Sequence, residues 1–142
     1  GSSLILENRK LGDDNIAELS NLEVLLEVIS LDLGENNISD SGLHTLVNSP
    51  YIKNLKTLNL KSNNITEEGA KFIAESSKLK DLEHLILKFN RIGEAGANYL
   101  AQSETLTNLR TLDLFRNRIG DAGVKVIKKS KNFRGVSRMR LD

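Results

Sequence analysis

The sequence lacks the residues on which several common kinds of site depend. It contains no cysteine, no tryptophan and only two histidines. Without cysteine the chain can form neither a disulfide bond nor a thiolate metal site, and its stability does not require an oxidising compartment. Neither His44 nor His84 has further ligand residues at metal-binding spacing, so we expect no metal site.

Long apolar runs and catalytic motifs are missing as well. No apolar run approaches the roughly 18–20 residues of a membrane-spanning helix, and no signal-peptide pattern opens the chain. Residues 93–96 contain two glycines but belong to a recurring helix start rather than to a phosphate-binding loop. No serine lies in a nucleophile elbow or a triad pattern. We therefore expect no enzyme activity, no catalytic residue and no cofactor.

What the sequence has is a repeat of 27 residues. Residues 55–81, 82–108 and 109–135 align without gaps, and the same frame extends over residues 1–27 and 28–54 and a partial unit, residues 136–142. One such unit cannot bury its own apolar side, whereas stacked units can. The repeat therefore predicts a single solenoid domain over residues 1–142.

Each unit is predicted to form a strand followed by a helix. Two apolar residues separated by one position indicate a strand with one buried face, and a helix is predicted over residues 67–77 of the third unit. Acidic residues suit the first turn of each helix, with Ser39 and Thr66 as expected N-caps. The recurring glycine either allows close helix approach or supplies an unusual turn. The recurring apolar pairs are Leu4/Leu6, Leu31/Leu33, Leu58/Leu60, Leu85/Leu87, Leu112/Leu114 and Met139/Leu141. The recurring asparagines are Asn36, Asn63, Asn90 and Asn117. The recurring glycines are Gly42, Gly69, Gly96 and Gly123.

The pattern LxxLxLxxNxI followed by GxxxI, as in residues 55–73, resembles the leucine-rich repeat family. The period of 27 and the helical second half are similar to its ribonuclease-inhibitor-like subfamily. The resemblance implies an α/β horseshoe segment, with a parallel β-sheet on the concave side and helices on the convex side. It also implies a buried ladder formed by the side chains of Asn36, Asn63, Asn90 and Asn117.

The two ends of the repeat array depart from this pattern. Arg9 replaces the asparagine of the first unit and Asn15 replaces its glycine, which indicates a degenerate unit or a cap. Neither end resembles a finished polar cap, and we expect a fragment of a longer array. The subfamily and the lack of cysteine-rich caps favour an intracellular location. The Asn, Lys and Ile content is similar to that of effectors that bacteria deliver into a host cell cytosol.

Charge is distributed unevenly along the chain. Residues 1–54 carry nine acidic and three basic residues, a net charge of −6, and residues 55–142 carry +7. Such a gradient can orient a partner, or it can be drift between repeats without consequence. A basic end over residues 124–142 raises the alternative of an anionic ligand, either nucleic acid or a membrane. Its lysines are spread around a predicted helix without an aromatic platform, so we expect neither ligand.

Residues that alternate with the core leucines are expected on the concave face. Exposed phenylalanine beside arginine is typical of an interface hot spot, and aromatic residues are only 4% of the chain. We therefore predict a monomeric module that binds a protein or peptide, with a structural spacer in a larger protein as a further alternative. The candidate binding residues are His84, Ile86, Lys88, Phe89, Arg110, Asp113, Phe115, Arg116, Arg138 and Arg140.

The same residues also allow an interpretation without a partner. Equal positions in adjacent units are lateral neighbours, which predicts cation–π pairs of Lys88 with Phe115 and of Phe89 with Arg116. It also predicts an ion pair between Asp113 and Arg140, and alternating charges at Lys56, Glu83 and Arg110. Ladders of this kind stabilise a sheet modestly.

Overall fold

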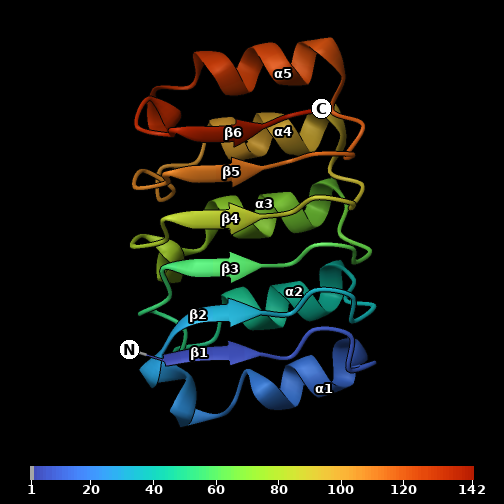
Figure 1. Ribbon diagram of the computed structural model, residues 1–142, viewed down its shortest axis with the longest axis vertical. Coiled ribbons are helices and arrows are strands. Elements are labelled where there is room, and N and C mark those ends of the chain that lie inside the picture. The colour runs from blue at the N-terminus through green and yellow to red at the C-terminus, as the bar shows by residue number, and fades with distance from the viewer. Residues whose placement is uncertain (1) are drawn as a thin grey trace.

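Strands and helices alternate along the chain in a computed structural model that describes residues 2–142 (Figure 1). The predicted order of a strand and then a helix is confirmed in every full unit. The strands are β1 (Ser2–Ile5), β2 (Val28–Asp32), β3 (Thr57–Asn59), β4 (His84–Ile86), β5 (Thr111–Asp113) and β6 (Arg138–Arg140). The α-helices are α1 (Gly12–Leu19), α2 (Asp40–Val47), α3 (Glu67–Glu75), α4 (Gly93–Ala101) and α5 (Gly120–Lys129). Short 3-10 helices follow as η1 (Glu23–Glu27), η2 (Ser77–Leu79) and η3 (Lys131–Phe133).

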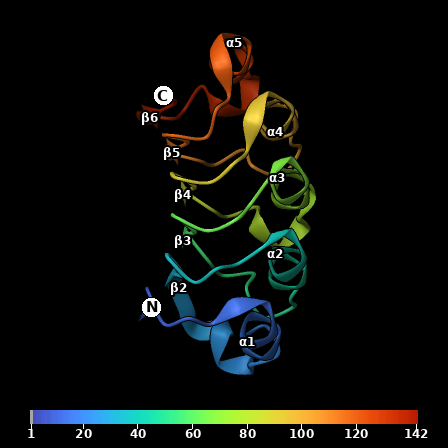
Figure 2. The same ribbon diagram turned by 90° about the vertical axis from the view of Figure 1, so that its right-hand side faces the viewer.

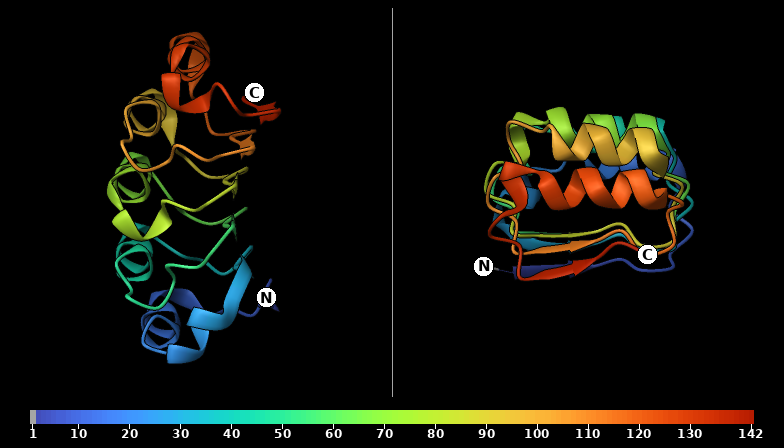
Figure 3. Two further views of the ribbon diagram at one scale, coloured as in Figure 1. Left: turned by 90° about the vertical axis from the view of Figure 1, so that its left-hand side faces the viewer. Right: turned by 90° about the horizontal axis from the view of Figure 1, so that it is seen from above.

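The strands form one parallel sheet in the order β1 to β6. Its register follows the repeat, because Leu31 pairs with Leu58, Leu58 with Leu85, Leu85 with Leu112, and Leu112 with Met139. The helices form a second layer (Figure 3), and Figure 2 shows them on the outer side of a gentle arc with the strands on its inner side. This is the arrangement expected when wide helices stack beside strands about 4.8 Å apart. We call the inner side the strand face.

The core lies between the two layers and consists of the recurring apolar residues. The leucine pairs of the second to fifth units are fully buried, from Leu31 to Leu114. In the end units, Leu4, Leu6 and Met139 are only partly buried. Each end unit has a neighbour on one side only, so the same position in the repeat excludes less water there.

The predicted asparagine ladder is confirmed. Asn36, Asn63, Asn90 and Asn117 are all at most 8% exposed. The Asn63 Oδ1 atom accepts hydrogen bonds from the backbone N–H groups of Asn36 and Ile38 in the preceding unit, both at 3.0 Å. The Asn36 amide serves the first unit in the same way, accepting from the backbone N–H of Arg9 at 3.0 Å. The backbone of the turn in the first unit is therefore hydrogen-bonded even though Arg9 replaces the asparagine there.

The recurring glycine allows close helix packing, which settles the alternative raised by the sequence. A Cβ atom on Gly96 would lie 2.4 Å from the Ile92 Cγ2 atom and 3.2 Å from the Ala70 Cβ atom of the preceding helix. The unusual turn is supplied by a different glycine, because Gly93 has a φ of +69° at the start of α4. A side chain is excluded at the first position by packing and disfavoured at the second by backbone conformation.

Two local predictions about the helices need correction. Helix α3 ends at Glu75 rather than at residue 77, because the chain then turns into η2. The Thr66 hydroxyl caps α3 as predicted, accepting from the Glu68 N–H at 3.4 Å. Ser39 occupies the N-cap position of α2, but its hydroxyl accepts no N–H of the helix and donates to the Asp13 carboxylate of the preceding unit. The acidic residue of one unit thus takes over the N-terminus of the next helix.

Candidate interaction surface

The strand face is acidic toward the N-terminal end. Glu7, Asp32 and Glu35 lie there with one lysine, and the Lys61 Nζ atom lies 2.5 Å from Glu7 Oε1. This hydrogen bond to Glu7 raises the pKa of Lys61 above 10.5, and the charges of Asp32 and Glu35 add to the effect. Because Lys61 and Glu7 belong to the third and first units, the pair joins two units that are not adjacent.

Gly34 makes this long ion pair possible. It occupies the position between Glu7 and Lys61, and a Cβ there would lie 2.9 Å from Lys61 Cγ and 3.0 Å from Cε. Without a side chain at residue 34, the lysine stem lies across the second unit and covers its backbone. The acidic half of the strand face is thereby partly neutralised from within.

The opposite half of the strand face carries an aromatic and arginine cluster. The rings of Phe89 and Phe115 meet edge to face with centroids 5.7 Å apart. The guanidinium carbon of Arg140 lies 4.3 Å from the centroid of the Phe115 ring, and that of Arg116 lies 5.3 Å from it. We call these four residues the Phe–Arg cluster. Phe115 is half-buried under the two arginines, whereas the Phe89 side chain is 48% exposed.

Asp113 holds this cluster in position. It is 9% exposed, and its Oδ1 atom accepts a hydrogen bond from the Phe115 N–H at 3.0 Å. Its Oδ2 atom lies 3.9 Å from Arg140 Nη1, which confirms the predicted ion pair. Asp113 thus holds both the backbone of Phe115 and the guanidinium group of Arg140. Because it is buried, its role is to position the cluster.

The predicted lateral cation–π pairs are wrong. Within residues 2–142, Phe115 meets Arg116 and Arg140 instead of Lys88, and Phe89 meets Phe115 instead of Arg116. Strand β4 ends at Ile86 and β5 at Asp113, so these side chains lie beyond the ladder on which the lateral rule depends. Phe89 and Arg116 also have φ values of 60° and 59°, which turns their side chains away from strand geometry.

The other predicted residues surround the cluster at different depths. His84 is half-buried, and its Nδ1 atom lies 2.9 Å from Thr111 Oγ1. Lys88 is half-buried, and Arg110 and Arg138 are exposed. Of the predicted alternating charges at Lys56, Glu83 and Arg110, the first two form an ion pair, with the Lys56 Nζ atom 3.3 Å from Glu83 Oε2.

Ile86 interrupts a second regular feature of the strand face. At the equivalent position, Asp32, Asn59 and Asp113 each accept a hydrogen bond from the N–H two residues later, at 2.9, 3.0 and 3.0 Å. Isoleucine cannot accept such a bond. The fourth unit therefore exchanges a turn-stabilising bond for a half-buried apolar side chain next to the Phe–Arg cluster.

Two arginines that the sequence interpretation missed lie beside Phe89. Arg91 and Arg118 are exposed and, with Phe89 and Arg116, line a hollow of about 430 Å³ together with Asn90 and Asp142. They occupy the same position in adjacent units, so the repeat frame could have placed them side by side. The prediction included Phe89 and Arg116 from the turns that follow β4 and β5, but it stopped before Arg91 and Arg118 in the same turns.

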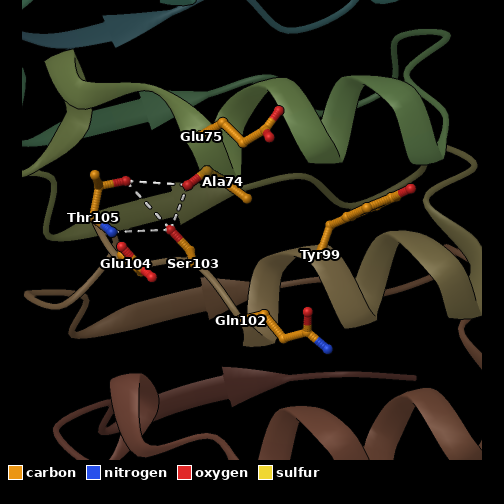
Figure 4. A pocket seen from close by; sticks show the side chains of 7 residues that line it. All are labelled: Ala74, Glu75, Tyr99, Gln102, Ser103, Glu104 and Thr105. Carbon is orange, nitrogen blue, oxygen red and sulfur yellow. Dashed lines mark hydrogen bonds between the residues drawn. The ribbon is translucent and has the colours of Figure 1, made fainter.

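The helical side also has a hollow, and two of its hydroxyls bond to the backbone of the preceding unit. It measures about 470 Å³ and lies beside Tyr99 and Ser103 (Figure 4). The hydroxyls of Ser103 and Thr105 both donate to the Ala74 carbonyl, at 2.6 and 3.2 Å. Equivalent serines bridge the other units in the same way, as Ser49, Ser76 and Ser130 show with bonds of 2.6–2.7 Å. Ser103 is therefore part of a serine ladder that joins the units.

The predicted basic end does not form one surface. Lys125, Lys128 and Lys129 are exposed on α5 in the helix layer, whereas Arg138 and Arg140 lie on β6 in the sheet (Figures 1 and 2). His44 lies on α2 as expected, with its ring 4.4 Å from that of Phe72. None of the helices in residues 2–142 is long and apolar enough to cross a membrane.

Comparisons with known proteins agree with this architecture. The C-terminal domain of tropomodulin from Caenorhabditis elegans superposes with a TM-score of 0.68 at 17% sequence identity, covering 93% of this chain and 84% of that one. At this identity the likeness shows the fold alone. A search of curated proteins gives no match. The family model described as Leucine Rich repeat matches residues 28–47, 51–74, 78–101 and 105–128, which is more than half of the chain. The ribonuclease-inhibitor-like subtype stays a prediction, and the chain belongs to the leucine-rich repeat family.

Proposed function

We propose that this domain binds a protein or peptide through the half of the strand face formed by β4, β5 and β6. Leucine-rich repeat domains are generally protein-binding modules. The observation that carries the proposal is the Phe–Arg cluster, in which the exposed Phe89 meets Phe115 edge to face and two arginines lie over the Phe115 ring. Aromatic residues and arginine are the residues most enriched at interface hot spots.

Phe89 is the central residue of this surface. Its side chain is 48% exposed, and its backbone has a φ of 60°, a conformation that costs a residue with a Cβ roughly 1–2 kcal/mol. The edge-to-face contact with Phe115 returns only about 0.5–1.5 kcal/mol. Glu35 and Ser62 share this backbone conformation at the equivalent position, so it is the exposed ring, and not the backbone, that supports a role in recognition.

The interpretation without a partner accounts for only part of the cluster. Contacts among Asp113, Phe115 and Arg140 do stabilise the end of the sheet. They leave Phe89 half exposed and give no role to the exposed Arg110 and Arg138. A spacer would not require an apolar and cationic surface on one end of one face.

The test is affinity capture with matched surface variants. We expect wild-type protein to capture partners that a Phe89→Ala/Phe115→Ala variant loses. Tyr99→Ala is the control, because Tyr99 is an exposed aromatic residue on the helical side. Circular dichroism should show that both variants fold. Identical sets of captured proteins for wild type and the Phe89→Ala/Phe115→Ala variant would refute binding at this surface and favour a spacer.

A further inference from the structure

We infer that the hollow beside Phe89 binds an acidic segment of the partner, with carboxylate side chains on its arginines. The inference rests on the proposed function and gives the partner its chemical class. We call the site the arginine hollow, defined by Phe89, Arg91, Arg116 and Arg118 around a space of about 430 Å³. A hollow of this size has room for a few side chains of a bound peptide.

The first argument is that the arginines of the hollow have no ion-pair partner among the described residues. The ion pairs found in residues 2–142 are Lys56–Glu83, Lys61–Glu7 and Arg140–Asp113. Arg91, Arg116 and Arg118 take part in none of them, although Asp142 lines the same hollow. Three guanidinium groups around one concave space repel one another, and an anionic ligand would remove that repulsion.

The second argument comes from the equivalent position in the preceding units. There, Asn37 and Asn64 satisfy each other, because the Asn64 Nδ2 atom donates to Asn37 Oδ1. In the next pair of units the same lateral neighbours are Arg91 and Arg118. A neutral hydrogen-bonded pair is thus replaced by two like charges, which destabilise neighbouring positions in a stacked array. The replacement is unfavourable for the free domain and favourable for a domain that receives an anion.

The charges of the whole strand face favour an acidic peptide over a nucleic acid. Glu7, Asp32 and Glu35 lie toward the other end of the same face, and a long polyanion along the sheet would meet them. A short acidic segment confined to the hollow avoids this repulsion. Guanidinium groups bind carboxylates through paired hydrogen bonds, and the exposed Phe89 ring provides an apolar contact for a neighbouring side chain of the same segment.

The experiment is fluorescence anisotropy with a labelled synthetic peptide in which glutamates flank a single phenylalanine. A peptide with glutamine in place of every glutamate is the control ligand. Arg91→Gln/Arg118→Gln is the test variant, because both side chains are exposed and outside the core. Lys128→Gln/Lys129→Gln is its matched control, because it removes the same charge from the exposed end of α5.

We expect the glutamate peptide to bind more tightly than the glutamine peptide, and binding to weaken with salt. Arg91→Gln/Arg118→Gln should weaken binding about tenfold, whereas the lysine variant should retain affinity within about twofold. Equal loss in both variants would overturn the inference, because it would show a general effect of net charge. Equal binding of the two peptides, or tighter binding of an oligothymidylate of the same length, would overturn it as well.

Failure of this inference and failure of the proposed function give different results. If the glutamate peptide does not bind but the Phe89→Ala/Phe115→Ala variant still loses captured partners, the strand face binds a protein and only the acidic class is wrong. If the captured partners are unchanged in that variant, the proposed surface itself is refuted, whatever the peptide does.

Discussion

Replacing Asn90 by alanine should destabilise the domain by about 2–3 kcal/mol, and the structure shows which atom is responsible. Asn90 is 6% exposed, and its Oδ1 atom accepts from the Ile65 N–H at 3.0 Å. Its Nδ2 atom donates to the carbonyls of Leu60 and Leu87, both at 2.9 Å. Those two carbonyls also accept from neighbouring asparagines, at 3.0 and 2.9 Å, so they retain a partner after the substitution. The buried Ile65 N–H loses its acceptor.

The magnitude follows from this difference between the donor and the acceptors. An orphaned buried donor costs about 1–3 kcal/mol, whereas a carbonyl that keeps one hydrogen bond loses much less. The measurement is urea unfolding followed by circular dichroism. With an m value near 2 kcal/mol/M, the midpoint should fall by about 1 M. Amide exchange of Ile65 should accelerate more than exchange at equivalent positions of distant units.

Two further variants make the result specific to the ladder. Asn98→Ala removes a half-exposed asparagine whose Nδ2 atom donates to the Glu94 carbonyl at 3.1 Å, and it should change stability by less than about 0.5 kcal/mol. Asn90→Asp keeps the acceptor for Ile65 but places a carboxylate against two carbonyl oxygens, so it should cost at least as much as alanine. Equal stability of Asn90→Ala and Asn98→Ala would refute the reasoning.

Three other predictions concern packing, charge and strain. Gly96→Ala should cost about 1–3 kcal/mol, because its Cβ would lie 2.4 Å from a buried isoleucine, whereas the control Gly135→Ala meets nothing within 4 Å; equal unfolding midpoints would contradict this. The raised pKa of Lys61 means that its pair with Glu7 stabilises the fold below pH 10.5 and is lost as pH rises through the folded pKa. The difference in melting temperature between wild type and Lys61→Met should therefore narrow above that pH, and a constant difference would count against the pair. Arg118→Asn should raise the free energy of unfolding by about 0.5–1 kcal/mol, because asparagine tolerates a φ of 55° better than arginine does. It should also weaken binding of the glutamate peptide in fluorescence anisotropy. A gain in stability with unchanged affinity would show that Arg118 does not contribute to peptide binding.

Positions fixed by contact between units were predictable from the sequence. The leucines, Asn90 and Gly96 recur because every unit packs against copies of itself, so the period of 27 directly reports which side chains face a neighbour. The serine ladder obeys the same rule and was missed. Ser76 and Ser103 stand 27 residues apart, but a serine hydroxyl has no apolar signature, and only the bond to the carbonyl of the preceding unit reveals its role.

Side-chain contacts in the turns were predictable only in part. The repeat frame sets Arg91 beside Arg118, but the strands of the middle units are three residues long, and strand alternation does not extend to Lys88 and Phe89. Left-handed backbone then directs Phe89 toward Phe115 and brings Arg118 to the same hollow. A sequence reports the direction of a side chain only while the backbone remains regular, and the interaction surface begins where that regularity ends.

The departures from the repeat are informative because each of them costs stability and because they occur together. Ile86 gives up a hydrogen bond that the equivalent residues of three other units make. Phe89 holds an exposed ring on strained backbone, and Arg91 and Arg118 bring like charges together where a preceding pair of units has hydrogen-bonded asparagines. Ile5 also replaces the acceptor in the first unit, and Glu35 and Ser62 share the left-handed backbone of Phe89, so neither feature alone marks a site. The exposed Phe89 ring and the like-charged Arg91 and Arg118 do lie together in the turns after β4 and β5, and the proposed partner would convert the cost of these like charges into affinity.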